Sequence, residues 1–238
     1  MSSKNSHTST LFHFTKNQNS LFSILKEGVR FSYCQEEFPG GYEIAIPMIS
    51  FCDIPLIQCK EHRDKYGKYA IGFSKNIVNK LNDNKNIKIA PISYFTKQQL
   101  SLCEILKSYV LNKNRVVGWF KAFEMIRNSK QQINYDECEW RMLKNDDEWY
   151  WSINEYRTNK EVNKPLFLKD NQIEFSIEDI RYIIVYQEVN IKSTIKRIRA
   201  LKTIGGNKCS KEDLDLLISK VISFDYISKD FLKYYICS

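Results

Sequence analysis

The chain of 238 residues is 43% hydrophobic and 13% aromatic, which is typical of a folded globular protein. It has no run of about 18 apolar residues and opens on a polar stretch, so the sequence excludes a membrane-spanning helix and predicts no secretory signal; we expect a cytoplasmic protein. The formal net charge of +8 is compatible with nucleic acid or another polyanion as a partner.

Cysteine and histidine do not form a metal-binding pattern. The seven cysteines include no Cys-x-x-Cys spacing, and the chain has only three histidines. We therefore expect reduced packing cysteines and no bound metal.

The first part of the chain alternates short strands with helices. After a flexible tail of residues 1–9, the apolar residues around His13 predict a strand, and Leu21 and Leu25 fall at helical spacing before Gly28, a helix stop. Further strands are expected at residues 29–33, 48–53 and 69–73, with a polar helix carrying His62 between the last two.

The middle of the chain favours helices before the sheet resumes. Residues 96–99 have the form of a capping box and predict a helix through Tyr109. Trp119, Phe123 and Ile126 recur at i, i+4 and i+7, which predicts a second helix with one buried face. Later strands are expected at residues 165–168, 172–175 and 181–186.

The C-terminal part is predicted to be helical. Ile191, Ile195 and Ile198 mark one face of a helix, and its other side forms a basic surface at residues 192–202 that could bind nucleic acid. The basic residues are Lys192, Lys196, Arg197 and Lys202. A break at Gly205 precedes a further helix from Ser210. We predict a single α+β domain with a mixed or antiparallel sheet at residues 10–187 and a helical appendix at residues 188–238.

Glu137 and Glu139 are the residues that point most directly to chemistry. If the segment is a strand, side chains alternate with a period of two, so both carboxylates share a face with Arg141. They could then be a solvated strand face or a Glu139–Arg141 surface pair that contributes little. Alternatively, Glu139 could stabilise the positive charge that develops when a nicotinamide–ribose bond breaks, with Glu137 accepting the proton of the incoming nucleophile.

Polar residues elsewhere are candidates for the same ligand. His13 and Thr15 share a strand face and could donate to a sugar or amide, although a buried structural histidine fits equally. Ser50 ends a core strand and is either structural or a small hydroxyl beneath a nucleotide. Tyr66 and Tyr69 are either exposed residues or rings on which a base or nicotinamide stacks.

These segments, in this order, resemble the AbiGi family of bacterial abortive-infection proteins, which act in phage resistance. The resemblance covers roughly residues 10–187, and its most specific block is Ser50–Leu56. The matching blocks are residues 11–15, 47–56, 62, 66–73, 137–141 and 180–185. It implies an anti-phage role, which for this family is described as that of an antitoxin-like regulator that binds and restrains a cognate toxin.

The block order is also similar, more distantly, to DarT-like ADP-ribosyltransferases, toxins that modify DNA. This similarity implies an ADP-ribosyltransferase-like fold, with NAD as the substrate and a nucleic acid or protein as the acceptor. It implies that His13 and Thr15 hold the nicotinamide ribose, that Tyr66 or Tyr69 stacks, and that Glu139 is catalytic. The first strand lacks the arginine that some transferases use to bind phosphate.

Overall fold

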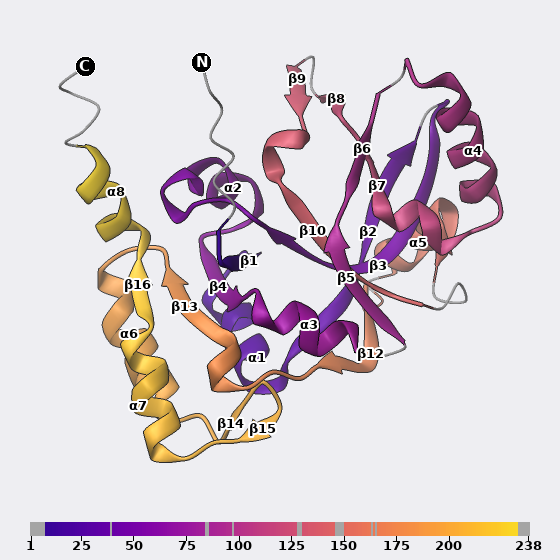
Figure 1. The fold of residues 1–238 in the computed structure, drawn as a ribbon. Coiled ribbons are helices and arrows are strands. Elements are labelled where there is room, and N and C mark those ends of the chain that lie inside the picture. The colour runs from indigo at the N-terminus through magenta and orange to yellow at the C-terminus, as the bar shows by residue number, and fades with distance from the viewer. Residues whose placement is uncertain are drawn as a thin grey trace. The chain divides into compact units, whose positions relative to one another are not determined.

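The computed structural model describes residues 8–38, 40–83, 86–96, 98–127, 130–145, 150–162, 164 and 166–232. The chain forms two compact units, each assembled from separate stretches of sequence (Figure 1). Unit 1 contains Met1–Val29, Phe51–Ile77 and Gln172–Ser238, and unit 2 contains Arg30–Ser50 and Val78–Asn171. Each unit contains both strands and helices, so the predicted α+β class is confirmed.

The start of the described chain is held against unit 1. Residues 1–7 of the predicted tail lie outside the described residues. Thr8 donates its backbone N–H to Asp53 Oδ1 at 3.1 Å, and the backbone N–H of Lys75 donates to the carbonyl of Ser9 at 3.0 Å. Asp53 also forms an ion pair with Lys75, so the first described residues are fixed to the fold.

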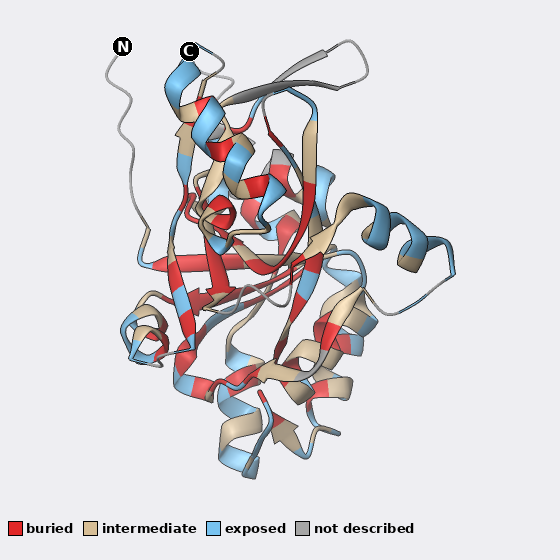
Figure 2. Cartoon of the chain, turned by 90° about the vertical axis from the view of Figure 1, so that its right-hand side faces the viewer, coloured by how far each residue is buried: buried red, intermediate tan, exposed pale blue. Residues whose placement is uncertain are grey.

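The sheet of unit 1 is mainly antiparallel. Strand β1 (Thr10–Thr15) pairs antiparallel with β4 (Tyr69–Ser74), and β4 pairs antiparallel with β13 (Ile180–Val185). The short strand β16 (Val221–Ser223) adds to β13 in parallel. Figure 2 shows mostly buried residues along the central strands. A small hairpin is formed by β14 (Thr203–Ile204) and β15 (Asn207–Lys208).

Local capping signals account for two helices of unit 1. Helix α1 (Gln18–Glu27) begins after Asn17, whose side chain accepts from the backbone of Ser20, and ends at Gly28, where φ is 97°. The predicted helix and its stop are therefore confirmed. Helix α7 (Lys211–Ser219) begins at a capping box formed by Ser210 and Asp213. The other helices of this unit are α2 (Lys60–Tyr66), α6 (Val189–Ile198) and α8 (Phe224–Leu232).

Unit 2 is built around the long hairpin of β2 (Val29–Phe38) and β3 (Tyr42–Cys52). Strand β10 (Glu139–Lys144) pairs with β3 and runs antiparallel to β5 (Ile87–Pro91). Strand β11 (Trp151–Ser152) also pairs with β3, and β12 (Phe167–Ile173) pairs with β2. The expected strands at 165–168 and 172–175 overlap this single strand β12, while Pro165 lies outside the described residues.

Helix α4 (Leu100–Leu111) packs on the hairpin of unit 2 through one apolar face. It begins at Leu100, four residues after Thr96, the first residue of the predicted capping box. Lys97 of that box lies outside the described residues. In the sequence, α3 (Asn76–Asn82) begins in unit 1 and ends in unit 2, and α5 (Ile153–Glu161) follows β11. The core of unit 2 includes Phe38, Ile46, Phe95, Leu106, Val117 and Leu143, all nearly inaccessible to solvent.

The predicted helix through Trp119, Phe123 and Ile126 is wrong. This segment contains a 3-10 turn and then the strands β7 (Phe120–Ala122) and β8 (Glu124–Arg127). Strand β7 pairs in parallel with β6 (Ser93–Phe95), and β8 pairs with β9 (Lys130–Ile133). Hydrogen bonding to strands elsewhere in the chain outweighs the helical spacing of the three apolar residues.

In the part of the chain that the structure describes, no helix is long and apolar enough to cross a membrane.

Candidate functional site

Glu139 and Arg141 lie on one face of β10, as the strand alternation predicts. Arg141 Nε donates to Glu139 Oε1 at 2.7 Å, and Nη2 lies 3.4 Å from Oε2. The expected surface pair is instead buried, because Arg141 is fully inaccessible and the Glu139 side chain is 8% exposed. Because both charges are removed from water, the loss of one partner should destabilise the fold far more than it would in an exposed pair.

Glu137 lies close to Glu139, although it is not part of strand β10. The strand begins only at Glu139, and Tyr135–Glu137 is a 3-10 turn, so the predicted strand face shared by the two acids is wrong at Glu137. Between them Cys138 adopts a left-handed conformation with φ of 43°. This turn brings Glu137 Oε2 and Glu139 Oε2 each to 2.7 Å from Lys121 Nζ.

Three further side chains complete this group, which we call the buried charge cluster: Glu36, Ser50, Tyr94, Lys121, Glu137, Glu139 and Arg141. Glu36 Oε1 accepts from Arg141 Nη2 at 2.7 Å. Ser50 Oγ donates to Glu139 Oε1 at 3.0 Å, and Tyr94 Oη accepts from the backbone N–H of Glu139 at 3.2 Å. All seven residues belong to unit 2.

Three members of the cluster, Glu36, Tyr94 and Lys121, carry no sequence signal that predicts a site. Glu36 lies 105 residues from Arg141 in the chain, on a strand whose neighbouring residues alternate in and out of the core without marking it. Lys121 falls in the segment whose apolar spacing predicts a helix. No local signal identifies either residue, because their positions depend on how β2 and β7 pair with other strands.

Burial and the neighbouring charges shift the pKa values of the cluster in different directions. Burial alone raises the pKa of Glu139, but the charges of Arg141 and Lys121 outweigh it and lower this pKa to about 2. For Glu36, burial raises the pKa and prevails over the opposing charges of Arg141 and Lys121. Burial opposes the charge on Lys121, yet the three nearby carboxylates raise its pKa.

The shifts in pKa distinguish Glu139 from Glu36. Glu139 is ionised at neutral pH, and Glu36 is the carboxyl group that binds a proton more readily than usual. The cluster contains three carboxyl groups, Glu36, Glu137 and Glu139, and two cations, Lys121 and Arg141. Near neutral pH, Glu139 can act as a fixed negative charge but not as a proton donor.

The remaining candidates lie in unit 1, around the ends of β1 and β4. Thr15 and Tyr69 are directly opposed in the two strands, and His13 is opposed to Ile71. The His13 ring is half-buried and lies 5.8 Å from the Phe51 ring. Tyr66, at the end of α2, is 37% exposed.

Gly67 holds this turn close to β1. Its φ is 144°, and a Cβ atom here would lie 2.2 Å from the carbonyl oxygen of Thr15. Only glycine allows the approach, which places Tyr66 and Tyr69 beside the end of β1. The predicted site residues thus form two groups: Thr15, Tyr66 and Tyr69 with His13 in unit 1, and Ser50, Glu137 and Glu139 in unit 2.

Within the described ranges, no group of three or more histidine, cysteine or acidic side chains is arranged to hold a metal ion. The carboxylates of the cluster are directed instead at Lys121 and Arg141.

Two comparisons found known proteins that are similar in sequence to this chain. Residues 41–119, which include β3 and α4, match a family model described as "Putative abortive phage resistance protein AbiGi, antitoxin". The chain is also 26% identical over 245 aligned positions to "Abortive phage resistance protein AbiGi" of Lactococcus lactis subsp. cremoris. Both comparisons support the AbiGi resemblance. The second alignment covers 86% of this chain and 96% of its relative, so the similarity to AbiGi includes both units. No solved structure matches the chain.

Proposed function

We propose that this protein acts in abortive phage resistance as an antitoxin-type regulator, which restrains a partner toxin by binding it. The abortive-infection role is supported by the similarity to AbiGi along most of the chain, and the regulatory mode by the family description. The observation that carries the non-catalytic mode is the state of Glu139, whose two carboxylate oxygens are both engaged by other side chains of unit 2.

A catalytic carboxylate must reach its substrate. Ser50 and Arg141 donate to Oε1 of Glu139, and Lys121 donates to Oε2, at distances of 2.7–3.0 Å. Arg141 Nη2 also lies 3.4 Å from Oε2, so two donors face each oxygen and a ribose hydroxyl would have to displace one of them. Displacing Lys121 or Arg141 leaves a buried charge without its partner, which costs about 3–5 kcal/mol. The cluster is therefore better suited to joining β10 to its neighbouring strands than to chemistry.

Co-expression with a toxin encoded beside this gene tests the regulatory role. We expect the wild-type protein to restore growth and to co-purify with the toxin. Rescue by Glu139→Gln should follow the amount of folded protein, measured from its thermal melting curve. Glu43→Gln, which changes an acid of unit 2 in an exposed ion pair, is the matched control. A Glu139→Gln protein that melts like the wild type but no longer binds or restrains the toxin would contradict the proposal.

A second candidate is an NAD-dependent ADP-ribosyltransferase with Glu139 as its catalytic residue. It is favoured by one observation: Ser50, Glu137 and Glu139, all expected at one site, do converge around Glu139 and Lys121. NAD labelled in its adenylate part would be incubated with single-stranded DNA, RNA and cell protein. Labelling by the wild type that disappears in a folded Glu139→Gln protein would support the transferase. Absence of labelling from all three acceptors would favour the regulator.

A further inference from the structure

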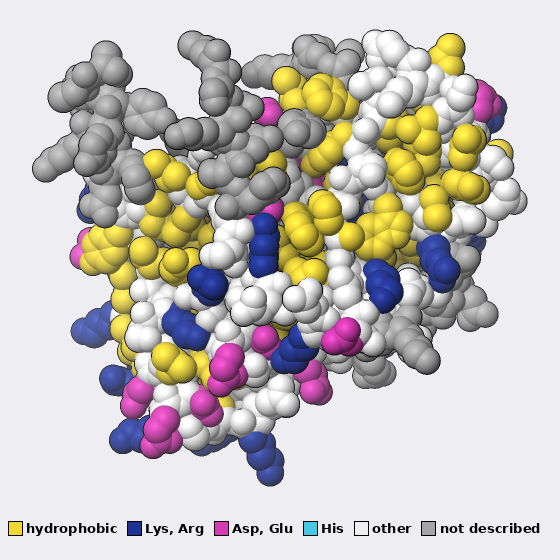
Figure 3. Space-filling model, in the orientation of Figure 1, with side chains coloured by type: hydrophobic (Ala, Val, Ile, Leu, Met, Phe, Trp, Pro, Cys, Tyr) yellow, Lys and Arg dark blue, Asp and Glu magenta, His cyan; other side chains and the backbone are white. Residues whose placement is uncertain are grey.

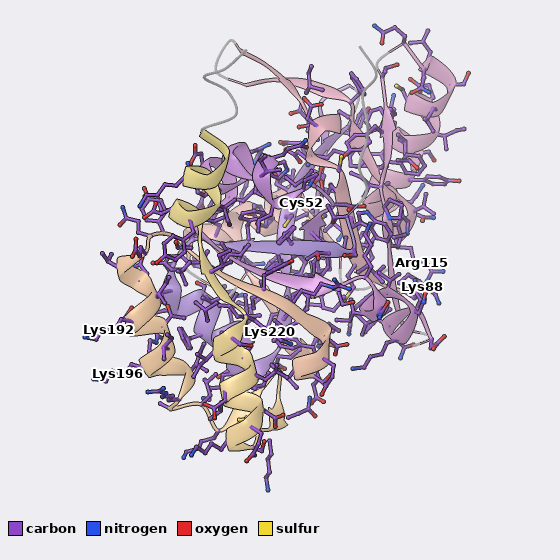
Figure 4. The ribbon with its side chains drawn as sticks, turned by 60° about the vertical axis from the view of Figure 1, so that its left-hand side comes forward. Cys52, Lys88, Arg115, Lys192, Lys196 and Lys220 are labelled. Atoms are coloured by element: carbon purple, nitrogen blue, oxygen red, sulfur yellow. The ribbon has the colours of Figure 1, made fainter. Side chains whose placement is uncertain are left out.

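Helix α6 of unit 1 carries a row of cations that the fold does not use. Lys192, Lys196 and Arg199 occupy positions i, i+4 and i+7, which places them on one face over about 10 Å of helix axis. All three are exposed, and within the described part of the chain none of them has an acidic partner. Figure 4 shows Lys192 and Lys196 projecting away from the helix. We call these three residues the α6 basic row.

Arg197 on the same helix has a different role. Its guanidinium lies 4.0 Å from the centre of the Phe22 ring and donates to Asn19 Oδ1 at 3.0 Å. Thr194 and Ile198 are completely buried on this inner side. Arg197 therefore fixes α6 to α1 and does not belong to the exposed surface. Of the other predicted residues, Lys202 is exposed but lies beyond the end of α6, and Arg199 extends the row of Lys192 and Lys196. Basic side chains appear along the left margin of Figure 3, where α6 lies in Figure 1.

A second feature lies at the end of β13, three residues before α6 begins. Because Ile184 is opposed to Ala70, Tyr186 comes next to Lys68 at the start of β4. Lys68 Nζ lies 4.3 Å from the centre of the Tyr186 ring, and Lys65 Nζ lies 4.9 Å from that of Tyr66. These four residues, the tyrosine–lysine cluster, combine positive charge with aromatic surface.

We propose that unit 1 binds single-stranded nucleic acid through these two features. The α6 basic row contacts successive phosphates, and the rings of Tyr66 and Tyr186 stack on unpaired bases. A row of exposed cations attracts a polyanion, and Glu188, one turn before Lys192, is paired instead with Lys229. Aromatic rings are the means by which proteins stack on the bases of unpaired strands.

A lipid surface fits the same residues less well. A helix that lies on a membrane inserts an exposed apolar face beside its basic residues. In α6, Ile198 is completely buried, Ile191 and Ile195 are half-buried, and Val189 at the first position is exposed, so no exposed apolar face runs along the helix. The proposed ligand is a binding partner additional to the toxin, so the inference does not depend on the proposed function.

Fluorescence anisotropy with the full chain tests the basic row. Labelled 20-nucleotide DNA and RNA strands and the matching DNA duplex would be titrated between about 50 and 200 mM salt. For the triple variant Lys192→Gln/Lys196→Gln/Arg199→Gln we expect about tenfold weaker binding of the single strands or more. The slope of log K against log salt should fall by about 2, because about 0.7 counterion is released per phosphate contacted on a single strand. The control Lys80→Gln/Lys160→Gln/Lys164→Gln removes the same charge from exposed positions in unit 2 and should change the affinity less than about twofold.

The ring contribution is tested separately with Tyr186→Leu, compared with wild type by thermal melting. We expect about fivefold weaker binding to single strands or more, since each stacked base contributes about 1–3 kcal/mol, and little change for the duplex. Equal losses in the two triple variants, or a duplex bound as tightly as the single strand, would overturn the proposal. It would also be overturned by binding to anionic phospholipid vesicles that excess oligonucleotide does not reverse.

Discussion

Arg141 Nε lies 2.7 Å from Glu139 Oε1, and both side chains are buried although they are only two residues apart on one strand. An exposed pair with the same geometry would contribute little to stability. Burial changes this, because each charge now depends on its partner instead of water. The stability of unit 2 should therefore be sensitive to single changes in the buried charge cluster.

Replacing Arg141 with methionine should strongly destabilise the protein. The variant keeps side-chain length but removes the cation that Glu36 contacts and leaves Glu139 with Lys121 alone, which we expect to cost about 3–5 kcal/mol in the free energy of unfolding. Arg157→Met is the matched control, because Arg157 also lies 2.7 Å from a glutamate, Glu43, but is 52% exposed. Its cost should be about 1 kcal/mol or less. Urea unfolding measures both, and equal costs would show that burial does not control the pair.

The contribution of Glu139 should depend on pH. Its folded-state pKa of about 2 lies below the usual 4.5, so the folded protein favours the ionised form. The stabilisation is fully present above pH 4.5 and is lost as the pH falls towards 2. The difference in the free energy of unfolding between wild type and Glu139→Gln should thus shrink over this range. A difference that stays constant from pH 6 to about pH 2 would argue against an ionised Glu139.

Glu36 should behave in the opposite way. Because burial raises its pKa, its ionisation becomes less favourable on folding, and its contribution to stability decreases as the pH rises above the usual 4.5. The neutral amide in Glu36→Gln still offers an oxygen to Arg141. At pH 7 we therefore expect Glu36→Gln to cost less than about 1.5 kcal/mol, well below the cost of Glu139→Gln. Urea unfolding at pH 7 compares the two variants, and the reverse ranking would contradict a raised pKa for Glu36.

Gly67→Ala should destabilise unit 1 by about 2 kcal/mol or more, because the new methyl group meets the Thr15 carbonyl in a backbone conformation that L-residues rarely adopt. Gly41→Ala is the control: its φ of 75° is also positive, but nothing lies within 4 Å of the new Cβ. Its cost should be about 1 kcal/mol. Thermal melting of the two variants distinguishes the contact with the Thr15 carbonyl from the cost of a positive φ. Equal losses of stability would mean that the turn at Gly67 adjusts to the methyl group.

The prediction of elements from sequence succeeded where the signal is local. Helix α1 stops at Gly28 as expected, and α7 begins at the capping residue Ser210. It failed at Trp119, Phe123 and Ile126, because a strand can satisfy its backbone groups with partners far away in sequence. The carbonyl of Phe95, for example, accepts from the backbone N–H of Phe123 at 2.7 Å.

The sequence by itself determined the α+β class, the AbiGi resemblance and the common face of Glu139 and Arg141, since these depend on residue order and on the period of a strand. Only the tertiary structure decided that this pair is buried, that Lys121 bridges Glu137 and Glu139, and that Glu36 shares Arg141. The physical reason is that the energy of a charge depends on the water removed around it. How much water is removed depends on strands brought together from distant parts of the chain.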